Sequence, residues 1–312
     1  MYLNLIQLKR TRFSTVVAAT LSVAASTCFF RANAQSNKPA SMPQMTVNGA
    51  SDVAEEMKTG PYSAPDWTQY RRFPTTRVYL QKAPWEAGVE QWWRGRFFRD
   101  GSAVHKIQEE IEVGLPHRFQ FDLYETWTID SARRVRHNSI APELRWAPAD
   151  WGKIPLNPTV YGEWTFTDKS VGPDLFEIKL LLGEELAPRW HWGLNAAWEQ
   201  EVGVHRATEL AVSQAVSYTL VDQKFGIGAE MVFRHESEIG TRSRPDYTFL
   251  VGPSAQWHIT PKVHLDIVPL VGTTAASPRV ESYVVLSIDI WPGEQGPSRP
   301  HGPTSTRASG GH

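Results

Sequence analysis

The chain has 312 residues, of which 41% are hydrophobic and 21% charged, and its 32 basic side chains nearly balance 33 acidic ones. That balance gives no support for a nucleic-acid partner, because such proteins carry a basic excess that neutralises phosphates. A mean hydropathy of -0.37 argues against a bundle of membrane-spanning helices, which needs several apolar stretches of about 20 residues. The 13 Trp are nevertheless many for an ordinary water-soluble domain.

Residues 1–34 have the three parts of a secretory signal peptide. A basic stretch without acids precedes the apolar run 14–30, and an A-x-A sequence ends at Ala34, after which we predict cleavage. Two alternatives remain open, an uncleaved membrane anchor and a lipoprotein attached through Cys28, although the Thr before this Cys suits lipidation poorly. Because Cys28 is the only cysteine, the processed chain is predicted to form no disulfide.

The segments on either side of the main domain have a different composition. Residues 35–75 are polar and Pro-rich without a hydrophobic period, which predicts a flexible periplasmic leader. Residues 76–81 resemble a short strand that ends at Pro84. Residues 292–312 are rich in Pro, Gly and Ser, and we expect a disordered tail. The predicted domain between leader and tail is 76–291.

From residue 87 onward, apolar side chains alternate with polar or small ones. In 225–233, one face carries Phe, Ile, Ala, Met and Phe, whereas the other includes two Gly and a Glu. Segments 175–183, 190–199 and 283–291 repeat the pattern with Trp, Leu and Ile on one face. A period of two is typical of β-strands with one apolar and one polar face.

Twelve segments of the chain alternate in this way. They are 87–98, 103–113, 118–129, 137–147, 158–167, 174–186, 189–202, 207–220, 223–236, 245–259, 262–272 and 279–291. Most connections alternate between short turns and longer polar loops. Long strands in even number with this loop pattern predict an all-β fold, a transmembrane antiparallel β-barrel of about 12 strands, with short periplasmic turns and longer extracellular loops.

The aromatic residues support the same architecture. Membrane-facing Trp and Tyr gather where the strand ends meet the headgroup layers, because their rings are amphipathic. The aromatic residues near the short turns are Trp146, Trp190, Trp192, Trp257 and Trp291, and those near the longer loops are Phe97, Trp127, Trp164, Trp198, Phe233 and Tyr247. The alternative, a soluble β-sandwich, favours strands of about 5–6 residues and gives no reason for two aromatic bands.

Three stretches resemble a known group of proteins: 73–85 (FPTTRVYLQKAPW), 114–124 (GLPHRFQFDLY) and 181–192 (LLGEELAPRWHW). The chain is similar, over about residues 70–291, to uncharacterised Gram-negative outer-membrane β-barrels of the transporter type. The resemblance implies an outer-membrane location but no particular solute, catalytic residue or binding residue. Many such barrels end on an aromatic residue, whereas here a polar tail follows Trp291.

We expect the function to depend on the lumen. The alternation directs these candidates inward: Arg94, Arg96, Glu110, Glu112, Asp122, Glu143, Arg145, Glu163, Glu177, Lys179, Glu199, Glu230 and Asp266. Acids outnumber bases among all the side chains predicted to face inward, so an open pore would favour cations or small polar solutes. The prediction is a passive channel with outer-membrane lipid and a small polar solute as partners; the alternative is a closed barrel, because pairs such as Lys179 with Glu199 could shut the lumen. The oligomeric state is not predicted.

Two histidines near Pro261 are weak candidates for metal ligands. A tight turn at Pro261 places His258 opposite His264 and Gln256 opposite Asp266, but these supply too few ligands for a metal site. We therefore predict no metal and no cofactor.

An outer-membrane lipid enzyme would need a Ser, a His and an orienting group on the outward face. The polar exceptions there are Gln91, Glu109, Glu125 and Gln214, with no His, so no enzyme is predicted. A surface-binding role for loop 237–245, with Arg242 and Arg244, is a further alternative.

Overall fold

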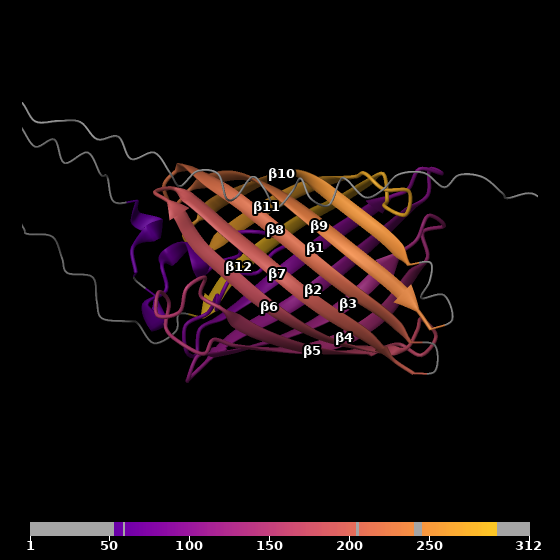
Figure 1. Cartoon of the computed structure of the whole chain (residues 1–312), viewed down its shortest axis with the longest axis horizontal. Helices are drawn as coiled ribbons and strands as arrows, with labels where there is room; N and C mark the ends of the chain where they lie inside the picture. The colour runs from indigo at the N-terminus through magenta and orange to yellow at the C-terminus, as the bar shows by residue number, and fades with distance from the viewer. Residues whose placement is uncertain (1–52, 59, 204–205, 240–244, 292–312) are drawn as a thin grey trace, which may run out of the picture. The chain divides into compact units, whose positions relative to one another are not determined.

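The computed structural model describes residues 53–58, 60–203, 206–239 and 245–291. Within this part of the chain, twelve antiparallel strands close into one barrel, in which each strand pairs with its sequence neighbours and β1 pairs with β12. Figure 1 shows the strands winding obliquely around the barrel, with three short 3-10 helices at one end. None of the helices in the described residues is long and apolar enough to cross a membrane.

The strand bounds agree with the alternation in the sequence to within a few residues. The strands are β1 (Ala87–Phe97), β2 (Ala103–Leu115), β3 (Phe119–Ile129), β4 (Val135–Trp146), β5 (Thr159–Thr167), β6 (Asp174–Ala187), β7 (Trp190–Val202), β8 (Ala207–Val221), β9 (Phe225–Glu238), β10 (Asp246–Thr260), β11 (Val263–Gly272) and β12 (Val280–Trp291). The predicted all-β fold and the number of strands are confirmed. The strand expected at 76–81 is absent, because these residues pair with no neighbouring strand.

The connections define two ends of the barrel. At the turn end, short connections such as 188–189 and 261–262 join the strands, together with the longer segment 147–158. At the loop end, the connections run from 98–102 to 273–279. The signal peptide, residues 35–52 of the leader, the C-terminal tail and the arginines of loop 237–245 lie outside the described residues.

The outward face of the strands is largely apolar and carries the predicted aromatic bands. Trp146, Trp190 and Trp257 are exposed near the turn end. Near the loop end the exposed aromatic residues are Phe97, Trp127, Trp164, Trp198, Phe233 and Tyr247. An apolar surface between two aromatic bands is the arrangement of a barrel embedded in lipid.

The lumen is filled at the turn end by the chain that precedes β1. We call residues 53–58 and 60–86 the plug segment; it begins with η1 (Ala54–Glu56), η2 (Pro61–Ser63) and η3 (Asp66–Thr68). The prediction of a flexible leader is therefore wrong for residues 53–75, and the barrel begins at Ala87 rather than at residue 76. The segment lacks a hydrophobic period because it packs as an irregular chain, with each side chain meeting a different partner.

An apolar core anchors this segment inside the barrel. Trp67, Phe73 and Tyr79 of the plug segment are buried in one cluster with Trp151, which lies in connection 147–158. The Trp151 ring makes edge contacts with Trp67 and Tyr79, with ring centres 5.6 and 5.4 Å apart. The one long connection at the turn end is thus part of the packing that covers the plug segment.

Candidate functional site

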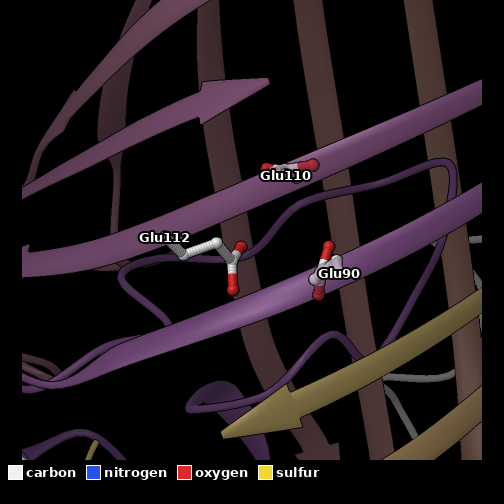
Figure 2. A group of neighbouring side chains, drawn as sticks. All are labelled: Glu90, Glu110 and Glu112. Carbon is white, nitrogen blue, oxygen red and sulfur yellow. The ribbon is translucent and has the colours of Figure 1, made fainter. Parts of the chain in front are cut away.

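A belt of carboxylates lines the inner wall near the turn end. Its members are Glu90 on β1, Glu110 and Glu112 on β2, Asp122 on β3 and Glu143 on β4, each at most 3% exposed. Figure 2 shows the first three on two neighbouring strands, with the plug segment passing behind them. One carboxylate oxygen from each of these three lies within 4.8 Å of the others. Such a cluster requires nearby cations, because buried charges are costly unless paired.

The plug segment provides most of those cations. Arg71 Nη2 lies 2.6 Å from Glu90 Oε2, and Arg77 Nη2 lies 2.7 Å from Glu110 Oε1. The Lys82 ammonium lies 3.5 Å from Glu112 and 2.6 Å from Asp289. The acidic wall and the basic plug segment therefore match each other.

One cation of the belt belongs to the barrel itself. Arg145 is fully buried and pairs with Asp122 and Glu143. Its Nη1 also donates to Gln81 of the plug segment at 2.6 Å. The belt thus retains one guanidinium of its own whatever the position of the plug segment.

The tip of the plug segment reaches the middle of the strands and is held there by polar contacts. The Thr75 amide donates to Glu230 at 2.9 Å, and Thr76 Oγ1 donates to Ser213 Oγ at 3.0 Å. The backbone of Arg77 exchanges two hydrogen bonds with the Asn195 amide, at 2.8 and 2.7 Å. These contacts satisfy backbone groups that would otherwise be buried without partners.

Glycines on the inner wall make room for the plug segment. Gly183 and Gly193 face each other across β6 and β7, and Val78 lies over both. A Cβ built on Gly114 would lie 1.9 Å from the carbonyl oxygen of Ala83. The wall is therefore shaped for a chain in close contact with it.

The register at Pro261 is as predicted, with His258 opposite His264 and Gln256 opposite Asp266. Tyr70 of the plug segment packs against both imidazoles, with ring centres 4.2 and 5.9 Å away. Neither histidine belongs to a group able to hold a metal among the described residues. The groups that have such spacing are carboxylate clusters of the belt, and these are neutralised by arginine and lysine.

The side chains predicted to face the lumen all lie on the inner face, in two sets. The set around the plug segment is Glu110, Glu112, Asp122, Glu143, Arg145, Glu230 and Asp266. The set toward the loop end is Arg94, Arg96, Glu163, Glu177, Lys179 and Glu199. Lys179 pairs with Glu177 at 2.6 Å, whereas the suggested pair with Glu199 is absent, because Lys179 is in register with Ala197.

Sequence reasoning missed Glu90, Glu281 and the cations of the plug segment. Arg94 and Arg96 both bind the Glu281 carboxylate, at 2.7 and 2.9 Å, and Arg234 approaches it at 3.3 Å. Glu281 follows on β12 the same inward alternation as the residues predicted to face the lumen, so the alternation could have identified it. The plug cations carry no comparable signal beyond the absence of acids between Asp66 and Glu86.

These features define the class of the protein. A closed antiparallel barrel with an apolar outer face, two aromatic bands and a charged interior is a transmembrane β-barrel of the outer-membrane type. Its lumen holds a segment of its own chain.

No family model matches the sequence, and no curated protein matches it. Solved structures that resemble it include the NanC porin (TM-score 0.45, 11% identity, 66% of this chain and 99% of that one). An outer-membrane channel from Pseudomonas putida F1 is similar with TM-score 0.47 and 10% identity over 67% of this chain and 97% of the other. The translocator domain of the autotransporter NalP from Neisseria meningitidis has TM-score 0.41 and 10% identity over 66% of this chain and 88% of that one. The function of this chain must therefore be inferred from its own residues.

Proposed function

We propose that this protein is an outer-membrane channel for small polar solutes whose lumen is closed at the turn end by its own plug segment. The observation that carries the proposal is the pairing of the plug cations Arg71, Arg77 and Lys82 with carboxylates of the barrel wall. A barrel that only had to be filled could use apolar side chains, since replacing buried ion pairs by packed apolar residues is often neutral or stabilising. Ionic contacts instead leave a wetted, charged passage when the segment departs.

Departure of the plug segment would change the charge of the lumen. Among the described residues outside the plug segment, the belt of five carboxylates would then retain only Arg145 as a close cation. Rings of carboxylates favour cations in channels. We therefore propose that the open passage conducts cations and small polar solutes in preference to anions.

A lipid enzyme is less well supported. The prediction that no His faces outward is wrong: His105 stacks on Trp93, and His137 lies 3.2 Å from Glu125 on the outer face. A His–Glu pair still needs a nucleophile. The outward faces of β1 to β5 carry no Ser, Thr or Cys among the described residues, and this supports a role other than lipid hydrolysis.

A closed barrel with a structural or surface-binding role is the second candidate. The burial of the plug segment favours it, because the lumen is obstructed at the turn end in this structure. The two candidates differ in whether the plug segment ever leaves.

Conductance with a tethered plug segment separates the two candidates. The side-chain oxygens of Thr76 and Ser213 are 3.0 Å apart, so a Thr76→Cys/Ser213→Cys variant can tie the tip to β8. A Cys28→Ser background excludes other thiols. In planar bilayers under a salt gradient we expect cation-selective openings of the parent chain, silence of the oxidised variant and recovery after reduction. Openings that the disulfide leaves unchanged would disprove gating by this segment, and silence of every form would favour the closed barrel.

A further inference from the structure

A cavity lies between the tip of the plug segment and the loop end of the barrel. It has a volume of about 290 Å³, and Pro74, Thr75 and Arg77 contribute to its lining from the plug side. We call this cavity the vestibule. A neighbouring hollow of about 340 Å³ shares Arg94 and Lys106 with it and extends to the loops. The vestibule is therefore the part of the lumen that remains free while the plug segment is in place.

One wall of the vestibule is acidic. Four glutamates that line the cavity form a continuous cross-strand row over β5 to β8; in ring order they are Glu163, Glu177, Glu199 and Glu209, and Glu236 on β9 extends the row beyond the cavity. Like charges directly opposite each other destabilise a sheet, so such a row is costly to keep.

The row is only partly compensated by neighbouring side chains. Glu177 pairs with Lys179, and Glu209 lies 3.7 Å from Arg234. Glu163 is 8% exposed and accepts hydrogen bonds from the hydroxyls of Tyr161 and Thr165. For Glu199, no cationic group lies within 4.0 Å among the described residues. The acidic wall therefore keeps an uncompensated carboxylate that faces the cavity.

The wall across the lumen is basic. Arg94 and Lys106 are register partners on β1 and β2, and both line the vestibule. In the ring order of the barrel, β1 lies opposite β7, and β2 lies opposite β8. Arg94 is neutralised by Glu281, whereas Lys106 has no carboxylate within 4.0 Å in the described part of the chain. A free ammonium on one wall thus faces a free carboxylate across the cavity.

This separation of charge selects a class of ligand. A simple cation would be attracted by Glu199 but repelled by Lys106, and a simple anion would be attracted by Lys106 but repelled by Glu199. We propose that the vestibule binds small zwitterionic solutes, with the ligand carboxylate at Lys106 and the ligand ammonium at Glu199. A volume of about 290 Å³ is at the small end of ligand pockets and suits a molecule of amino-acid size. This assignment rests on the proposed channel, since it names the solute class at that channel's entrance.

The proposal is tested by measuring the binding of small probe molecules to the full processed chain. The chain is kept in detergent micelles at low salt, where the plug segment can stay in place. The probes are 5-aminopentanoate, pentylamine and pentanoate, measured by calorimetry. We expect 5-aminopentanoate to bind at least tenfold more tightly than either singly charged probe. Equal binding of pentylamine and 5-aminopentanoate would reduce the site to a cation site and overturn the proposal, as would the absence of binding.

Substitutions locate the binding to the two walls. Lys106→Met and Glu199→Gln should each weaken 5-aminopentanoate binding at least tenfold, and the exchange Lys106→Glu/Glu199→Lys should restore most of it. Glu109→Gln is the matched control, because Glu109 is on the same strand as Lys106 but faces outward. Heat-dependent gel migration checks that each variant is folded. Variants that fold and bind as the parent does would disprove the assignment.

The outcome is distinguishable from that of the channel experiment. Binding of 5-aminopentanoate by a chain that never conducts would refute the channel and leave the zwitterion site standing. If the chain conducts but 5-aminopentanoate neither binds to it nor reduces its conductance, the channel is supported and the site is refuted.

Discussion

Val78 of the plug segment packs against Gly183 on the inner wall of β6: a Cβ built on this glycine would lie 2.2 Å from Val78 Cγ1. A Cβ built on the register partner Gly193 on β7 would also lie too close, at 2.7 Å from Val78 Cγ2. Two glycines in register therefore form a depression in the wall that a single side chain of the plug segment fills. The contact is apolar and does not depend on the ion pairs.

Filling that depression should displace the plug segment. We expect Gly183→Val or Gly193→Val to expose the buried chain, because the new side chain overlaps Val78 within contact distance. Trypsin cleavage after Arg71 and Arg77 in the folded barrel should then accelerate at least tenfold.

The control for this experiment is Gly162→Val, because a Cβ at Gly162 meets no atom within 4 Å. Cleavage as slow as in the parent chain for both inner-wall variants would contradict the role given to the glycine pair.

The ion pairs provide a second, electrostatic test. Arg77→Leu removes the cation nearest to Glu110 and leaves Glu112 and Glu143 each with one cationic neighbour fewer. Breaking a buried pair from one side costs about 3–5 kcal/mol, so docking of the plug segment should weaken strongly. Hydrogen exchange of the residue-77 amide, which donates to Asn195 at 2.8 Å, should accelerate accordingly.

Arg134→Leu is the control for Arg77→Leu. Arg134 pairs with Asp130 in a loop, and its side chain is 65% exposed, so its removal should leave the exchange of the residue-77 amide unchanged. If both substitutions had the same effect, the buried network could not be what holds the segment.

The barrel could be predicted from sequence because the evidence is local and repeated. Each strand needs one apolar and one polar face, so the period of two marks it, and even the pairing of His258 with His264 follows from a tight turn. His137 shows where this reasoning ends. A register shift between Thr126 and Trp127 places His137 beside Trp127 on the outer face, and one extra residue is enough to reverse a side chain.

The plug segment could not be predicted because its contacts are individual rather than periodic. Arg71, Arg77 and Lys82 each make their shortest contact with a different carboxylate, and these carboxylates come together only when the ring closes. A polar, Pro-rich composition is shared by flexible linkers and by chains that fold against a charged wall. The distinction lies in the complementary charges, which are far away in sequence.

The outer face of β2 and β3 carries two carboxylates in direct register, Glu109 and Glu125. Charged side chains on the lipid face destabilise a barrel, and like charges opposite each other add to the cost. We expect Glu109→Leu to stabilise the barrel by about 1 kcal/mol, seen as a higher temperature for the gel-migration shift. Glu112→Leu, on the inner face of the same strand, should have the opposite effect because it leaves Lys82 with one carboxylate fewer. A lower shift temperature for Glu109→Leu would indicate that this carboxylate has a partner in the membrane.

Docking of the plug segment should also depend on pH through Glu55, which lies in η1 at the turn end. Burial raises the pKa of Glu55 above its ordinary value of 4.5, and Arg72, at 3.0 Å, offsets this only in part. The docked state therefore holds this proton more tightly than the undocked state. Its contribution to docking is fully present below pH 4.5 and is lost as the pH rises through the raised pKa.

The open probability in planar bilayers should consequently rise as the pH is raised from acid to neutral. Glu55→Gln keeps a polar side chain that cannot ionise, so the rise should be smaller in this variant than in the parent chain. The difference between the two curves isolates Glu55 from the other titrating groups of the lumen. Identical curves would assign the pH dependence to those other groups, and an open probability that falls with pH only in the parent would reverse the sign derived from the burial of Glu55.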